Sequence, residues 1–112
     1  MHMETEVLGG TIILKPQGRI DQNSAQAFQD GLLAVLDGGQ MAIAIDMSAV
    51  DFLSSIGLRA LMVGHKKSQT TGARLALFAL TPIVREVFSI SRFDTVLKCY
   101  DMRDPAIASL QP

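Results

Sequence analysis

The chain has 112 residues, of which 48% are hydrophobic and 19% are charged, and its formal net charge is -1. This length fits one domain with its own hydrophobic core. We therefore expect a single domain over residues 1–112, with residues 1–5 left open as a disordered or added tail. The near-neutral charge argues against a general nucleic-acid-binding protein, and one cysteine with two histidines excludes a disulfide framework and a structural zinc site.

The first half of the chain predicts a hairpin, a helix and a buried strand. Gly9-Gly10 separates a short segment from the β-rich residues 11–17, which indicates an antiparallel hairpin. Asn23, with Gln26 three residues later, matches a capping box and predicts that a helix opens at Asn23 and ends at Gly38-Gly39. The apolar stripe of this helix consists of Phe28, Leu32, Val35 and Leu36.

The second half alternates short apolar runs with helical patterns. Strands are expected over residues 41–47, 74–80 and 95–100, and helices over 56–69, from Thr81-Pro82 onward and over 104–110. We expect the Thr81 hydroxyl to cap its helix, with Pro82 at the first helical position. The resulting order predicts an α/β fold. We expect a mixed, mostly parallel β-sheet with an N-terminal antiparallel hairpin, covered by about four helices.

The candidate functional residues are two serines, Ser54 and Ser55, between an apolar segment and the helix expected over 56–69. The first N–H groups of a helix are unpaired and its N-terminus carries a partial positive charge. A phosphate attached there would be stabilised. Serine is also a favoured N-cap, so the simpler interpretation of both residues is a structural cap.

Motifs typical of enzymes are missing. The sequence has no nucleophile elbow, no phosphate-binding loop and no dinucleotide-binding glycine pattern. A triad of Ser55 with His65 can be written down, but a histidine on a covered helix is more often structural. Asp21, Asp46 and Asp51 suggest a receiver-type Mg²⁺ cluster, yet strand-end acids are usually only solvated. We expect no enzyme, no catalytic residue, no metal site and no cofactor.

Several segments, taken in this order and spacing, resemble the STAS domain family, specifically the stand-alone anti-sigma factor antagonists of bacteria. The resemblance extends from about Thr11 to Leu110. The segments that carry it are Gly18–Asp21, Ile45–Leu53, Ser54–Arg59, Arg74–Leu80 and Thr81–Arg85.

The resemblance implies a regulatory binding protein that is switched by phosphorylation. In the family, the unphosphorylated antagonist binds an anti-sigma factor that is also a serine kinase, and so releases the sigma factor or another client. Phosphorylation separates the two proteins, and a phosphatase resets the switch. By its position before Ile56-Gly57-Leu58, the family's phospho-acceptor matches Ser55. Ser54 stands where the family often has an acid, which makes it an alternative acceptor.

The resemblance also implies which residues surround the phosphorylation site and contact the partner. We expect Asp21 and Asp46 to orient the Ser55 hydroxyl in the kinase complex if both lie near the turn. The full expected set is Asp21, Asp46, Ser54, Ile56, Gly57, Leu58 and Arg59.

Two other functions stay open on the sequence. One is a STAS subunit that binds the ATPase of a lipid-transport complex without being phosphorylated, and the other is a small enzyme or nucleotide-binding domain. The apolar runs are too short to span a bilayer and no secretory signal is visible, so we expect a cytoplasmic protein without membrane insertion. An exposed edge strand leaves a weak homodimer open.

Overall fold

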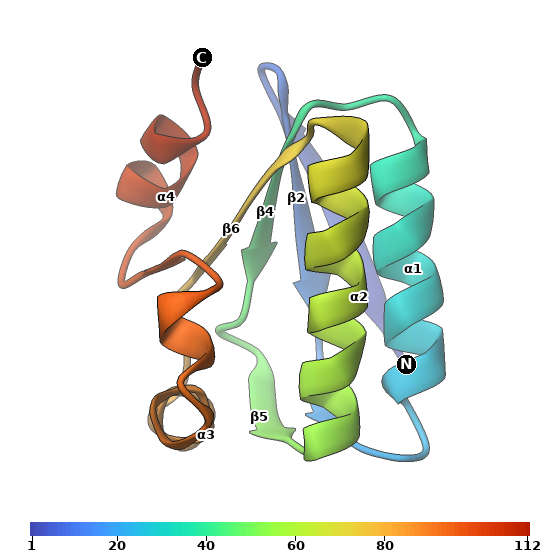
Figure 1. The fold of residues 1–112 in the computed structure, drawn as a ribbon, viewed down its shortest axis with the longest axis vertical. Coiled ribbons are helices and arrows are strands. Elements are labelled where there is room, and N and C mark those ends of the chain that lie inside the picture. Colours follow the sequence, from blue (N-terminus) through green and yellow to red (C-terminus); the bar gives the residue numbers. More distant parts are fainter.

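The computed structural model describes all 112 residues as two layers of helices around a sheet (Figure 1). The strands are β1 (Met3–Leu8), β2 (Thr11–Pro16), β3 (Gly18–Ile20), β4 (Ala42–Asp46), β5 (Val50–Leu53), β6 (Arg74–Phe78) and β7 (Cys99–Tyr100). The helices are α1 (Ala25–Asp37), α2 (Ser55–Thr71), α3 (Pro82–Ser91), α4 (Arg103–Ser109) and the short 3₁₀ helix η1 (Phe93–Thr95).

The main sheet has the strand order β1-β2-β4-β6-β7, in which only the β1–β2 pair is antiparallel. Gly9, with φ of 60°, makes the tight turn of this hairpin, because a left-handed backbone is easily adopted only by glycine. The predicted hairpin and the mixed, mostly parallel sheet are confirmed. Strand β1 begins at Met3, so most of residues 1–5 pair with β2 rather than forming a tail.

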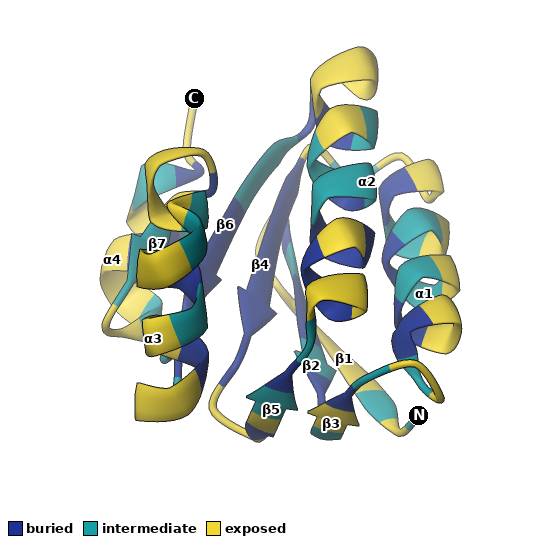
Figure 2. Ribbon diagram, turned by 60° about the horizontal axis from the view of Figure 1, so that its bottom comes forward, coloured by how far each residue is buried: buried dark blue, intermediate teal, exposed yellow.

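A second, two-stranded sheet joins β3 to β5 in parallel. Neither strand was expected as a separate element, because each is only three or four residues long. In Figure 2 these two strands lie side by side at the same end of the molecule as the start of α2. The small sheet thus fixes the segment that leads into that helix.

The two faces of the main sheet carry separate cores. Helices α1 and α2 lie side by side over one face (Figure 1), and the larger core includes Phe28, Leu32 and Leu61 from them. Gly64 on α2 leaves no room for a Cβ atom beside Leu32, so the two helices approach closely at this point. On the other face, α4 packs through Ala106 and Leu110 against small and apolar side chains of the strands.

Three local predictions are wrong. The N-cap of α1 is Ser24 rather than Asn23, and neither a side-chain cap bond nor the reciprocal bond of a capping box forms. Thr81 does precede α3, with Pro82 in its first turn, but its hydroxyl donates to the carbonyl oxygen of Val50 instead of accepting from the helix. Residues 95–100 form mainly a turn, and only Cys99 and Tyr100 pair as a strand.

Candidate functional site

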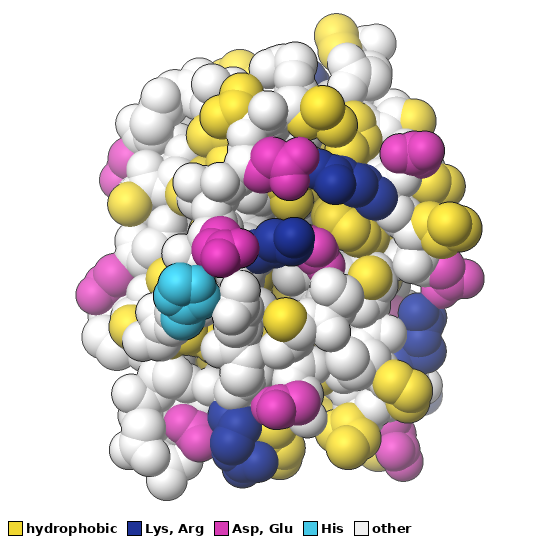
Figure 3. Space-filling view, turned by 180° about the vertical axis from the view of Figure 1, so that it is seen from behind, with side chains coloured by type: hydrophobic (Ala, Val, Ile, Leu, Met, Phe, Trp, Pro, Cys, Tyr) yellow, Lys and Arg dark blue, Asp and Glu magenta, His cyan; other side chains and the backbone are white.

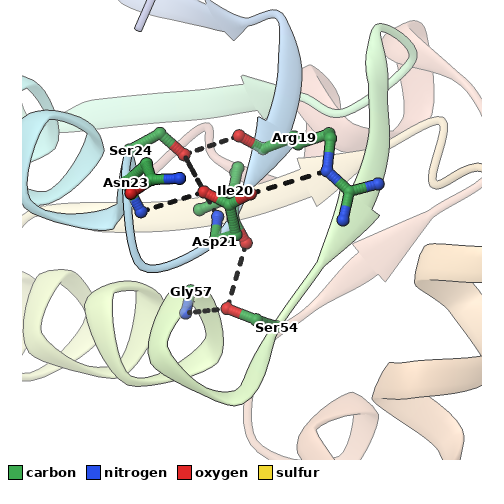
Figure 4. A network of polar contacts seen from close by, with 7 residues as sticks. All are labelled: Arg19, Ile20, Asp21, Asn23, Ser24, Ser54 and Gly57. Carbon is green, nitrogen blue, oxygen red and sulfur yellow. Dashed lines mark hydrogen bonds and ion pairs between the residues drawn. The ribbon is translucent and has the colours of Figure 1, made fainter.

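Ser54 joins the end of β5 to the start of α2. Its hydroxyl accepts a hydrogen bond from the Gly57 N–H at 3.2 Å, which is the N-cap bond of the helix. The same hydroxyl donates to the carbonyl oxygen of Ile20 at 3.1 Å, and the Ser54 N–H donates to that oxygen at 2.9 Å (Figure 4). Ser54 is therefore a half-buried structural residue with its hydroxyl already engaged.

Ser55 is in a different position, although it is the next residue. It is the first residue of α2 and is exposed, and its hydroxyl makes no hydrogen bond within the chain. A helix leaves its first N–H groups without intrahelical partners. The Ser54 hydroxyl accepts from the Gly57 N–H, and the Ser54 carbonyl accepts from the Leu58 N–H. The N–H groups of Ser55 and Ile56 therefore stay available to solvent or to an anion.

Gly57 seats this first turn of α2 against the small sheet. A Cβ atom at this position would lie 2.6 Å from Leu53 Cδ1, 2.8 Å from Ile20 Cγ2 and 3.0 Å from the Ile20 carbonyl oxygen. Real Cβ atoms do not tolerate the first two distances, so at least the neighbouring side chains would have to move. Glycine at this position lets α2 begin directly beside β3.

Asp21 follows β3 and holds its own loop together. Its Oδ1 accepts from the Asn23 N–H at 3.0 Å, and its Oδ2 lies 3.5 Å from Arg19 Nε (Figure 4). The Arg19 guanidinium stacks 4.1 Å from the centre of the Phe52 ring, which ties β3 to β5 through side chains as well. Asp21 belongs to the same polar network as Ser54 through Ile20, but it has no direct contact with Ser55.

Asp46 ends β4 and is buried. Its Oδ1 accepts from the Ser48 N–H at 2.9 Å, and its Oδ2 lies 3.9 Å from Lys15 Nζ. The first contact stabilises the turn between β4 and β5, and the second joins β4 to β2. The structure therefore brings Asp46 to the turn that precedes β5 and not to Ser54 or Ser55.

The remaining expected site residues divide into inward and outward positions. Ile56 is 47% exposed, whereas Leu58 is buried in the core. Arg59 is exposed and stands four residues after Ser55, so the two side chains are neighbours on one face of α2. The first turn of α2 holds no acidic residue.

The enzyme alternatives receive no geometric support. His65 follows Ser55 by almost three helical turns, which at about 1.5 Å per residue separates them by roughly 15 Å. No three His, Cys, Asp or Glu side chains gather closely enough to hold a metal ion, so Asp21, Asp46 and Asp51 form no receiver-type cluster. Seen from behind, basic and acidic side chains are intermixed on the surface (Figure 3).

Sequence reasoning singled out the two serines but missed what separates them. The distinction depends on the Ile20 carbonyl, which comes from a strand that was not predicted. The Arg19–Phe52 contact was missed for the same reason. None of the helices combines the length and apolar character that a bilayer span requires.

Comparison with known proteins gives a consistent result. The STAS domain family model matches residues 2–106. The candidate anti-sigma factor antagonist BtrV of Bordetella bronchiseptica is 30% identical over 111 residues, which cover 99% of this chain and 96% of BtrV. The crystal structure of an anti-sigma factor antagonist from Mycobacterium paratuberculosis has a TM-score of 0.90 at 26% identity, with 99% of this chain and 94% of that chain covered.

The fold is also that of the anti-sigma factor antagonist SpoIIAA of Bacillus, whose structure is known in two states. The unphosphorylated form gives a TM-score of 0.79 at 17% identity, covering 96% of this chain and 95% of SpoIIAA. The phosphorylated form gives 0.72 at 16% identity, covering 98% and 100%. At this level of identity the similarity shows the fold alone.

Proposed function

This chain belongs to the STAS domain family, among relatives named as anti-sigma factor antagonists, and we propose that it is an antagonist switched by phosphorylation of Ser55. In its unphosphorylated form it binds an anti-sigma factor with serine kinase activity, in the cytoplasm, through the surface around the start of α2. The sigma factor or another client is thereby released. Phosphorylation of Ser55 dissociates the complex, and a phosphatase restores the binding form.

The observation that carries this proposal is the contrast between the two serines. The Ser54 hydroxyl is half-buried and bonded to both Gly57 and Ile20, so phosphorylation of its oxygen would break the cap of α2. The Ser55 hydroxyl is exposed and free of bonds within the chain. A kinase can transfer a phosphate to the Ser55 oxygen without opening the fold. This favours Ser55 over Ser54 as the acceptor.

The free protein can accommodate a phosphate on Ser55. The partial positive charge of the α2 N-terminus favours an anion there, and the exposed N–H groups of Ser55 and Ile56 can donate to it. Arg59, one turn further along the same face, adds a full positive charge within reach. Phosphorylation therefore requires no rearrangement of the helix.

The same phosphate opposes binding of a partner. It adds about -1.5 to -2 charges at pH 7, and a docked partner would remove water from them. Ile56, 47% exposed beside Ser55, indicates that this surface has an apolar component suited to a desolvated interface. A penalty of about 3 kcal/mol weakens binding more than a hundredfold, because each 1.4 kcal/mol is a factor of ten.

The two aspartates act in this proposal by positioning. Asp21 orders the loop that places the Ile20 carbonyl under Ser54, and Asp46 orders the turn that leads into β5. Both keep the β5–α2 junction in the geometry that presents Ser55. Leu58 and Gly57 anchor this junction from below, while Ile56 and Arg59 face the partner.

The experiment is a phosphorylation assay with the cognate anti-sigma factor and ATP, read by mass spectrometry on the wild type, Ser55→Ala and Ser54→Ala. We expect one phosphate on Ser55 in the wild type, none in Ser55→Ala and retained phosphorylation in Ser54→Ala. Ser89, an exposed serine on α3, serves as the matched control through Ser89→Ala, which should not affect phosphorylation. Phosphate on Ser54 alone would refute the assignment.

A further inference from the structure

The molecule has a cavity of about 200 Å³ at the end of α2 remote from Ser55. Ser68, which lines it, follows Ser55 by more than three helical turns, or roughly 20 Å along the helix. The walls come from the C-terminal half of α2, the start of β6, the segment before β7 and the end of α4. The cavity is therefore spatially independent of the proposed phosphorylation site.

The cavity exists because the last strand of the sheet is too short. β7 pairs only with Leu77 and Phe78, so the first three residues of β6 have no partner on that side. The Arg74 N–H donates toward β4, to the Met41 carbonyl, and the Leu77 N–H donates toward β7, to the Lys98 carbonyl. Because these directions alternate along a parallel strand, the Leu75 N–H points to the open edge as an unpaired donor.

The permanently charged side chains that line the cavity are all positive. Arg74 and Lys98 both line the cavity, and no carboxylate does. Neither cation takes part in any ion pair of the structure. The Arg74 Nε donates to the Leu110 carbonyl oxygen at 2.5 Å, which holds the guanidinium in place and leaves its terminal nitrogens free. A cleft lined by one sign of charge concentrates counter-ions of the other sign.

The hydroxyl groups in the wall do not compete for these donors. Ser68 donates to the His65 carbonyl at 2.6 Å, and Ser109 donates to the Ala106 carbonyl at 2.6 Å. Both are turned toward their own helices. The donors left for a ligand are the two cationic side chains, the Leu75 N–H, the Gln69 amide and the His65 ring, all of which line the cavity.

From this arrangement we propose that the open edge of β6 is a binding site for a compact phosphate-type oxyanion, held by Arg74, Lys98 and the Leu75 N–H. The small volume restricts the ligand to free phosphate or a short phosphate monoester, because drug-sized ligands need pockets of roughly 300 Å³ or more. Arg74 supplies a planar, forked donor for phosphate oxygens, and Lys98 supplies an unpaired point charge.

The test is a titration of ¹⁵N-labelled protein with sodium phosphate, and separately with glycerol 3-phosphate, against sodium chloride at equal ionic strength. We expect saturable amide shifts at Leu75 and Lys98 with at least one phosphate compound and none with chloride. The comparison of the two phosphate compounds distinguishes free phosphate from a monoester. Lys98→Gln should weaken binding about fivefold, as for a partly exposed ion pair.

The matched control is Lys66→Gln, which removes an exposed, unpaired lysine of α2 that does not line the cavity. Its affinity for phosphate should stay within twofold of the wild type. Shifts that do not saturate, that chloride reproduces, or that weaken equally in both variants would overturn the site. Ser55→Ala should titrate like the wild type, so this test and that of the phosphorylation switch succeed or fail separately.

Discussion

The Ser54 hydroxyl donates a hydrogen bond to the carbonyl oxygen of Ile20, 34 residues earlier in the chain, at 3.1 Å. This bond makes Ser54 part of the contact between β3 and the start of α2. Ser55, one residue further, has no comparable contact and is exposed. The chain thus places a structural hydroxyl and a free hydroxyl side by side, and only the free one suits reversible modification.

This difference predicts unequal effects of two alanine substitutions on stability. Ser54→Ala should lower the free energy of unfolding by about 1–2 kcal/mol, because it removes the N-cap of α2 and the bond to Ile20. Ser55→Ala should change it by less than about 0.5 kcal/mol, as for other exposed positions. Urea unfolding followed by circular dichroism measures both values. Equal losses in the two variants would contradict the assignment of their roles.

A second prediction concerns the close packing at Gly57. Gly57→Ala should destabilise the protein by about 1–3 kcal/mol, because the added Cβ meets Leu53 and Ile20 at distances that force the core to shift. Gly10→Ala is the matched control, because a Cβ at Gly10 would meet nothing within 4 Å. Thermal unfolding of both variants checks the prediction. A Gly57→Ala variant as stable as Gly10→Ala would show that the junction is not tightly packed.

A third prediction concerns the single cysteine. Burial, and secondarily the negative charge of Asp94, raise the pKa of the Cys99 thiol from 9.0 to about 11, although Arg85 partly opposes this. Only the thiolate is nucleophilic, so iodoacetamide at pH 9 should react much more slowly with Cys99 in the folded chain than in urea. Equal alkylation rates in the two states would contradict the raised pKa of this half-buried thiol.

The raised pKa also sets the sign of a pH effect on stability. Between about pH 9 and 11 the thiol ionises in the unfolded chain but stays protonated in the folded one. The unfolded state is then increasingly favoured as the pH rises. The contribution of the Cys99 thiol to the free energy of unfolding is therefore fully present below pH 9 and is lost as the pH rises toward 11. Cys99→Ala should show a smaller loss of unfolding free energy over that interval than the wild type.

The sequence predicted the elements with strong local signals. Gly9-Gly10 correctly marked the hairpin, and the apolar stripe of Phe28, Leu32 and Leu36 correctly marked the buried face of α1. The alternation of strands and helices gave the mixed sheet with its helical layers. These features follow from turn chemistry and periodicity, which depend only on neighbouring residues.

Features that depend on distant partners were not predicted. The β3–β5 pair exists because each strand satisfies the backbone of the other, which a segment of three or four residues does not reveal alone. Ser24 precedes α1 where Asn23 was expected. The Asn23 backbone N–H donates to the Asp21 carboxylate, and the Ser24 and Ala25 N–H groups donate to the Asp21 carbonyl, so Asn23 lies within a turn built on Asp21. The Thr81 hydroxyl bonds to Val50 on β5 rather than capping its own helix.

For the candidate site, too, the local features were predictable and the contacts with distant residues were not. The position of Ser54 and Ser55 before a helix was readable from the sequence, and the resemblance to the STAS family singled out Ser55. The reason for preferring Ser55 depends on the Ile20 carbonyl and on exposure, which only the folded chain provides. Asp46 was expected beside the serines, but its contacts are with Ser48 and Lys15.

The most direct measurement is the dissociation constant for the cognate anti-sigma factor, determined by calorimetry on the unmodified protein and on protein phosphorylated uniformly at Ser55. The proposed switch predicts that the phosphate weakens binding more than a hundredfold, that Ser55→Asp weakens it in the same direction, and that Ser89→Asp leaves it unchanged. Equal affinity of the unmodified and phosphorylated proteins would contradict the proposed switch.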